Sequence, residues 1–112
     1  MKPETLKGHL DALILSVVET APLHGYAIIS ELRQRSGGTL ALPEGTVYPA
    51  LHRLEAAGLL SSNWSQAESR RRRVYRLTRR GRLRLAASRG EWRSFAAAVE
   101  SVLVPAAVGA RG

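Results

Sequence analysis

Arginine is concentrated in one stretch of this 112-residue chain, and its guanidinium group is well suited to bind phosphate. Residues 70–84 contain nine arginines and no acidic residue. Residues 1–60 hold five Lys/Arg against six Asp/Glu, whereas residues 61–112 hold twelve against three, so the net charge of +8 comes from the second half. This concentration indicates a polyanionic partner, and a solvated or disordered face is the plainer alternative.

A second group of polar residues shares one face of a predicted helix that Gly58 closes. The other face of that helix is apolar, at i, i+3, i+4 and i+7: Val47, Ala50, Leu51 and Leu54. The polar face suits contact with base edges and phosphates, and it carries Thr46, Tyr48, Pro49, His52 and Arg53. Pro49 fits in the first turn, where its missing N–H breaks no hydrogen bond. In the alternative, Tyr48 packs inside and His52 is only solvated.

Other kinds of chemistry have little support. The chain has no cysteine, which removes disulfides and thiolate sites. Its three histidines, His9, His24 and His52, fall in three different predicted helices and offer no metal-ligand spacing. There is no Ser-His-Asp arrangement, glycine-rich phosphate loop or carboxylate pair. We therefore expect no metal, no cofactor and no enzymatic activity.

Two helices are predicted before the polar face. The second runs from about His24 to Gly37-Gly38, where glycine can adopt the left-handed conformation of a helix stop. The connector 39–42 could hold one short strand. The first helix runs from about Thr5 to Thr20, ends before Pro22, and carries an apolar stripe: Leu6, Leu10, Leu13, Ile14 and Val17.

After Gly58 the pattern changes to a period of two, which predicts a β-hairpin around the polar stretch 65–69. Arg70–Arg72 then lie near its tip. The alternating residues are Leu60, Ser62 and Trp64 on one side and Arg73, Tyr75 and Leu77 on the other. Three helices and a hairpin are the order of a winged helix-turn-helix, whose third helix enters the major groove. We predict an α+β fold, mainly α, with residues 1–78 as the DNA-binding domain.

A final helix is predicted over residues 79–104, with Thr78 as its N-cap. Its apolar residues form a heptad-like stripe, which predicts dimerisation. Residues 105–112 are predicted to be a flexible tail. The expected homodimer interface uses this stripe and the first helix: Leu6, Leu10, Leu85, Trp92, Phe95, Val99, Val102 and Leu103.

The aromatic residues outside the polar face have less definite roles in the pattern. Tyr26 is expected to pack rather than to bind, and Trp64 to cover the core or the strand. Trp92 is expected at the dimer interface because aromatic side chains bury a large area. Trp92 and Phe95 also form a candidate site for a small aromatic or hydrophobic effector.

Three stretches resemble the PadR-type family of transcriptional regulators. Residues 22–28 (PLHGYAI) resemble the start of the family's second helix. Residues 45–55, followed by residues 58–60, resemble its recognition helix and the turn into the wing. Residues 70–78 and Gly81 resemble the second wing strand and the next helix start. The resemblance implies a homodimeric repressor that binds an inverted repeat near a promoter and is often released by a small ligand or stress signal.

The resemblance extends to the C-terminal helix. One helix follows the wing, as in the short branch of the family. In some short members a tryptophan of this helix faces a pore at the dimer interface and stacks on flat aromatic drugs. Trp92 lies at a similar position, eleven residues after Gly81. The wing departs from the family pattern because its run is unbroken arginine, where proline or lysine is common.

The sequence therefore predicts a sequence-specific DNA-binding transcriptional regulator, a repressor. Base contacts are assigned to the polar helix face, and phosphate contacts to Arg70, Arg71, Arg72 and Arg73. The start of the chain shows no signal peptide, and no run of about 18 apolar residues is present, so a cytoplasmic location is expected. The alternative is a winged-helix protein-interaction module with an acidic or RNA partner.

Overall fold

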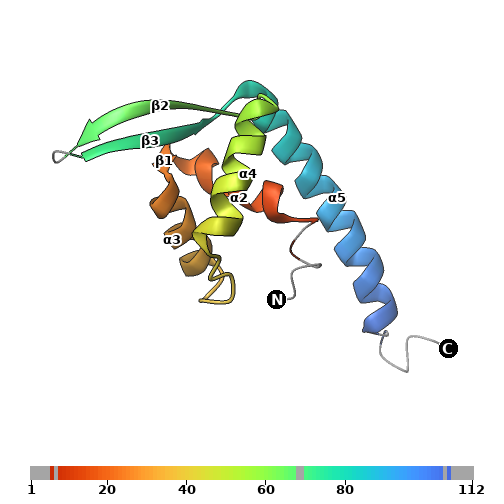
Figure 1. The fold of residues 1–112 in the computed structure, drawn as a ribbon. Helices are drawn as coiled ribbons and strands as arrows, with labels where there is room; N and C mark the ends of the chain where they lie inside the picture. Colours follow the sequence, from red (N-terminus) through yellow and green to blue (C-terminus); the bar gives the residue numbers. More distant parts are fainter. Residues whose placement is uncertain (1–5, 7, 68–69, 105, 107–112) are drawn as a thin grey trace.

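The computed structural model describes residue 6, residues 8–67, residues 70–104 and residue 106. The hairpin of β2 and β3 extends from one end of a helical body, and α5 leaves from the other (Figure 1). This is the predicted winged helix-turn-helix with a C-terminal helix. In chain order the elements are α2 (Leu10–Thr20), β1 (Leu23–His24), α3 (Gly25–Arg35), α4 (Glu44–Ala56), β2 (Leu60–Ala67), β3 (Arg70–Leu77) and α5 (Arg79–Leu103).

The small sheet is antiparallel, with β3 between β1 and β2. Ser62 pairs with Tyr75 and Trp64 with Arg73, so the predicted hairpin and its alternation are confirmed. The third strand differs from the expectation: it is β1, which pairs with β3, whereas residues 39–42 form no strand. Leu40 in that connector is instead buried against the core.

Helix α2 starts later than the predicted Thr5, a residue outside the described part of the chain. Leu6 is helical and buried, but residues 8 and 9 form a turn before the regular helix begins at Leu10. Glycine is a poor helix former, so Gly8 accounts for this interruption.

The ends of α2 and α3 fall where the sequence predicts them. Ala21 is extended (φ −165°, ψ 155°), as expected before Pro22. Gly37 and Gly38 have φ values of +62° and +90°, a region that glycine enters without strain. Both helix stops are therefore local effects of the residues that follow.

Helix α4 begins at Glu44, which places Pro49 in its second turn and corrects the prediction of a first-turn proline. Since proline has no N–H, the carbonyl of Gly45 receives no α-helical hydrogen bond from it. The stop is confirmed at Gly58, where φ is +77°. The predicted apolar face is buried as well: Val47, Ala50, Leu51 and Leu54.

Helix α5 joins the core near its start. Thr78 caps it as predicted, because its Oγ1 accepts a hydrogen bond from the Gly81 N–H at 3.0 Å. A Cβ at position 81 would overlap the carbonyl of Leu59, so glycine permits this close approach. Leu85 is then buried one turn further along the helix.

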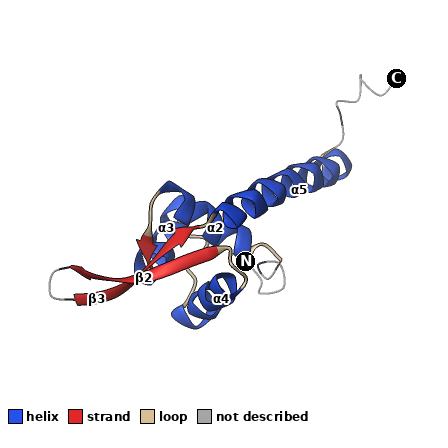
Figure 2. Cartoon of the chain, turned by 90° about the horizontal axis from the view of Figure 1, so that it is seen from above, coloured by secondary structure: helices blue, strands red, loops and turns tan. Residues whose placement is uncertain are grey.

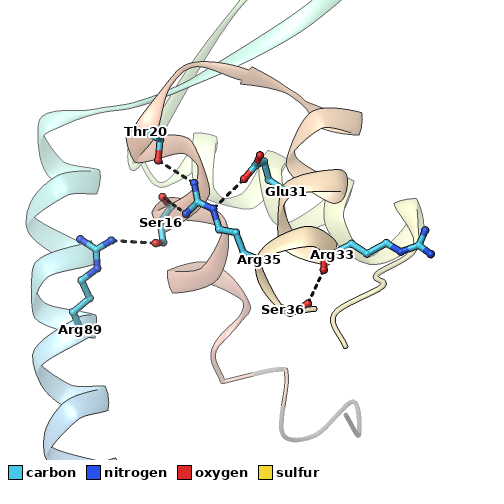
Figure 3. Close-up of polar contacts among 7 residues, drawn as sticks. All are labelled: Ser16, Thr20, Glu31, Arg33, Arg35, Ser36 and Arg89. Carbon is cyan, nitrogen blue, oxygen red and sulfur yellow. Dashed lines mark hydrogen bonds and ion pairs between the residues drawn. The ribbon is translucent and has the colours of Figure 1, made fainter. Parts of the chain in front are cut away.

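Beyond Arg89, α5 leaves the core. The Arg89 guanidinium donates to the Glu19 carboxylate at 2.9 Å and to the Ser16 hydroxyl at 3.0 Å, both on α2 (the second bond is drawn in Figure 3). Arg35 of α3 holds the same part of α2 through the Thr20 hydroxyl at 2.9 Å. Helix α2 is thus tied to both α3 and α5.

The molecule is elongated. It measures 67 × 28 × 23 Å, and its radius of gyration is 17.2 Å, against about 13 Å for a compact domain of this length. The hairpin and α5 project in opposite directions (Figure 2). Within the described residues, no helix is both long and apolar enough to cross a membrane.

Candidate nucleic-acid interface

The outer face of α4 forms the first part of the candidate interface. Pro49 and His52 are exposed on it. Tyr48 turns toward α3, where its ring occupies the space that a Cβ of residue 25 would need. It also meets the ring of Tyr26 edge-on, with centroids 6.3 Å apart. Tyr48 is half-buried and therefore packs as well as lining the surface.

Arg53, on the same helix, is already held by α2. Its Nη1 lies 2.9 Å from both carboxylate oxygens of Asp11, and both side chains are about half-exposed. An exposed ion pair adds little to stability, so this one mainly orients the arginine. Thr46, in the first turn of α4, is half-buried.

The wing arginines divide between the two faces of β3, because side chains alternate along a strand. Arg71 and Arg73 lie on the face of Tyr75, as predicted for Arg73. The guanidinium carbons of Arg71 and Arg73 are 4.6 and 5.4 Å from the centre of the Trp64 ring, respectively. Arg70 and Arg72 lie on the opposite face.

Arg73 links the wing to α4. Its Nε donates to the Ser62 hydroxyl at 2.7 Å, and its Nη2 lies 3.5 Å from the Glu55 carboxylate. That carboxylate also accepts a hydrogen bond of 2.6 Å from Ser62. Arg73 is therefore engaged within the fold, which sets it apart from Arg70 and Arg71.

Arg72 meets His24, the N-cap of α3. The Nδ1 of His24 accepts from the Ala27 N–H at 3.3 Å, and its Nε2 lies 2.9 Å from Nη1 of Arg72. A neutral imidazole accepts through one nitrogen only, so the two contacts compete for one lone pair. Burial lowers the pKa of His24, and the positive charge of Arg72 lowers it further.

These residues surround one groove between the start of α3, the outer face of α4 and the wing. It is lined by His24, Tyr26, Tyr48, His52 and Trp64, with Arg70–Arg73 along the wing side. The groove thus joins predicted contact residues of α4 to those of the wing, whereas Thr46, Pro49 and Arg53 lie outside it.

Sequence reasoning missed His24, Tyr26 and Trp64 as members of this surface. Tyr26 is 60% exposed and Trp64 is 52% exposed, so Trp64 is not a core residue, whereas Tyr26 still packs edge-on against Tyr48 as expected. Both residues could have been assigned from their neighbours. Trp64 pairs with Arg73 in the hairpin, and Tyr26 lies at the start of the helix that packs against Tyr48.

A second groove, of about 840 Å³, lies between the start of α2 and α5. Trp92 meets the ring of His9 edge-on at 5.3 Å, and Phe95 lies 6.3 Å from Trp92. Charged side chains, among them Asp11 and Arg89, share the lining. The two residues predicted to bind an effector therefore lie together, beside the start of α2.

The predicted dimer residues fall into two groups. Leu6, Leu10 and Leu85 are buried in the core of their own chain, since α5 packs on α2, and they offer almost no surface to a partner. The others lie on α5 beyond this contact and are half-buried or exposed: Trp92, Phe95, Val99, Val102 and Leu103.

A helix with an exposed polar face, flanked by an arginine-rich hairpin, is typical of winged-helix DNA-binding proteins. Residues 14–87 match the model of the transcriptional regulator PadR-like family. The chain belongs to this family and is a DNA-binding transcriptional regulator, so the resemblance in the three sequence stretches is confirmed.

Solved structures and a curated relative agree with this assignment. A PadR family regulator from Clostridium difficile R20291 is 37% identical, with a TM-score of 0.77 over 86% of this chain and 99% of its own. A transcriptional regulator from Clostridium thermocellum is 28% identical, with a TM-score of 0.81 over 88% and 96%. A transcriptional regulator of Mycobacterium tuberculosis is 43% identical over 67 residues, 60% of each chain.

Proposed function

We propose that this regulator is a homodimeric repressor that binds an inverted repeat in double-stranded DNA and acts in the cytoplasm. The observation that carries the proposal is the spatial division of the molecule. The exposed face of α4 and the arginine wing border one groove at one end, and the exposed apolar stripe of α5 projects from the other. The end with α4 and the wing suits DNA, and the end with α5 suits a second copy of the chain.

At the DNA end, the proposed roles follow from side-chain chemistry. Wing arginines provide affinity for phosphates of any sequence, because a guanidinium needs only a nearby phosphate oxygen. Discrimination between operators comes from base contacts of the α4 face in the major groove: Thr46, Tyr48, Pro49, His52 and Arg53. Bound at a promoter, the dimer blocks transcription.

At the other end, α5 acts as the dimerisation element, in line with the division into residues 1–78 and 79–104. Phe95 and Val102 are 59% and 80% exposed, and a stripe of this kind on a soluble helix suggests an interaction surface. An inverted repeat requires the two α4 helices of the proposed dimer to lie about one helical turn of DNA apart.

The groove beside Trp92 is the proposed effector site. Its volume of about 840 Å³ suits an aromatic or hydrophobic small molecule. Such a ligand releases DNA only if it binds more tightly to a dimer whose recognition helices are wrongly spaced. Quenching of tryptophan fluorescence by flat aromatic compounds should disappear in Trp92→Ala, which keeps Trp64. Quenching that persists in this variant contradicts the proposed site.

The first experiment is selection of bound duplexes from a random pool at near-physiological salt. Enrichment of an inverted repeat with half-sites about 10 base pairs apart supports a dimeric, sequence-specific regulator. Retention without any enriched sequence indicates that the wing is a general polyanion patch. The alternative, a winged-helix interaction module with an acidic or RNA partner, then becomes the better explanation.

A further inference from the structure

Trp64 is an unusual residue for the outer half of a hairpin. Its side chain is 52% exposed, although indole is one of the largest apolar groups that a fold can bury. It lies on the same face of the hairpin as Ser62, beyond the buried Leu60. The core therefore does not require an aromatic ring at this position.

The surroundings of Trp64 are cationic. Arg71 places its guanidinium 4.6 Å from the ring centre, within the range of a cation–π interaction, and Arg73 lies at 5.4 Å. Arg73 is also held by hydrogen bonds to Ser62 of the wing and to Glu55 of α4. No side chain among the described residues forms a hydrogen bond with Arg71, so none of them occupies its N–H donors.

A guanidinium that lies over an aromatic ring keeps its N–H donors in its own plane, at the edge of the stack. The ring restricts the arginine to few conformations, which reduces the entropy lost when a phosphate binds. The indole itself offers an apolar surface beside that phosphate. On the DNA backbone, the apolar group next to each phosphate is the deoxyribose.

We infer that Trp64 is a DNA-contact residue: its indole packs against a deoxyribose at the edge of the groove and holds Arg71 toward the neighbouring phosphate. This inference rests on the proposed function, since it assumes that the groove of α4 and the wing faces DNA. Trp64 lines that groove together with His52 of α4, so the contact lies beside the recognition helix.

If Trp64 contacts DNA, replacing it should lower the affinity for DNA although the charge of the protein is unchanged. Trp64→Leu should weaken binding to all duplexes by about twofold to fivefold, the range expected for an exposed cation–π stack. The dependence of affinity on salt should keep its slope, because no phosphate-binding charge is removed. The matched control is Leu83→Ala, an exposed apolar residue of α5 away from the groove, which should leave the affinity unchanged.

The decisive test uses the intact sequence labelled with 5-fluorotryptophan, which gives one ¹⁹F resonance for each of the two tryptophans. Trp64→Phe identifies the Trp64 line by its absence. On addition of a duplex that carries a fluorescent label, the Trp64 line should shift and its sensitivity to H₂O/D₂O exchange should fall. Duplex anisotropy is followed in the same titration.

The outcomes separate the two proposals. If anisotropy shows saturated binding while the Trp64 line and its solvent sensitivity stay as in the free protein, the contact is wrong and the DNA-binding function stands. If no duplex binds at any salt concentration, the proposed function fails. Folding of the Leu variant does not affect this test, because the labelled protein keeps Trp64.

Discussion

At the scale of single residues, the wing arginines differ in the partners they already have. Arg73 is bonded to Ser62 and Glu55, and Arg72 contacts His24. For Arg70 and Arg71, no side-chain hydrogen bond occurs within the described residues. The arginines of this run therefore have different roles, although they are one residue type. The role of each depends on its burial and on its position in the pairing of β3 with the other strands.

Replacing Arg70, Arg71 and Arg72 with Ala should weaken binding to every duplex and flatten the salt dependence. The log–log slope should fall by about 0.9 for each phosphate that the variant no longer neutralises. Affinity is measured by anisotropy between low and physiological salt. Weaker binding restricted to one operator sequence would contradict a phosphate role.

Arg73→Ala is the matched comparison, because Arg73 belongs to the same run but is bonded within the fold. Removing it leaves Glu55 without its charged partner, so we expect the free energy of unfolding to fall by about 1–2 kcal/mol. Arg70→Ala should change it by less than about 0.5 kcal/mol, as for other exposed positions. Chemical denaturation measures both values.

His24 makes the stability of the chain depend on pH. Its pKa is lower in the folded chain than its ordinary value of about 6.5, so the unfolded chain takes up a proton first as the pH falls. The His24 contribution to stability is therefore complete above about pH 6.5 and is lost below it. His24→Asn keeps a capping oxygen and does not titrate. Wild type should lose more thermal stability than this variant between about pH 7.5 and 5.5; equal losses would rule His24 out.

At the scale of elements, α4 carries a residue that its helix does not favour. Pro49 lies in the second turn and leaves the Gly45 carbonyl without its usual donor. It is also exposed, so it adds nothing to the core that would offset this cost. An exposed residue that destabilises its own helix is best explained by contact with a partner molecule, here DNA.

We expect Pro49→Ala to raise stability, by up to about 3 kcal/mol, and to lower DNA affinity. Gly90→Ala on α5 is the control, since a Cβ there meets nothing within 4 Å. It should also stabilise its helix, by about 1 kcal/mol, and leave DNA affinity unchanged. Thermal unfolding and duplex anisotropy test both variants. An unchanged affinity for Pro49→Ala would remove Pro49 from the interface.

The elements that sequence predicted well are those with local signals. The stops at Ala21-Pro22, Gly37-Gly38 and Gly58, and the cap at Thr78, depend on residues within one turn. Strand β1 could not be found in this way, because two residues become a strand only through pairing with β3, about fifty residues later. Local propensity does not contain that partner.

The candidate site shows the same limit. Apolar spacing identified Leu10 and Leu85 as buried positions, but it does not say which neighbour buries them, and the two lie in the core of their own chain. The arginine run was visible in the sequence, whereas the stack of Trp64 and Arg71 depends on pairing across the hairpin. Contacts between elements therefore required the structure.

At the scale of the whole molecule, α5 projects well beyond its contacts with the helical body (Figure 1). Its last fixed points on the body are the bonds of Arg89 to α2 and the edge contact of Trp92 with His9. The 11 residues from Arg93 to Leu103 then extend for about 16 Å. A small change of angle near Trp92 would therefore move the far end of α5 by several ångströms, and in the proposed dimer this would change the spacing of the α4 helices.

The proposed dimer is tested by charge on the exposed stripe. Phe95→Glu should leave the single chain folded, because the side chain is already 59% exposed, but it should disfavour an apolar interface between two copies. Sedimentation should then show a monomer at concentrations where the wild type is a dimer. Affinity for an inverted repeat should fall to that for a single half-site, since the second binding event is no longer intramolecular.

The control is Leu83→Glu, a change at a similarly exposed position on another face of α5. This variant should remain a dimer with full affinity. A Phe95→Glu protein that stays dimeric would place the interface elsewhere, and movement of α5 could then not explain the proposed release of DNA by an effector.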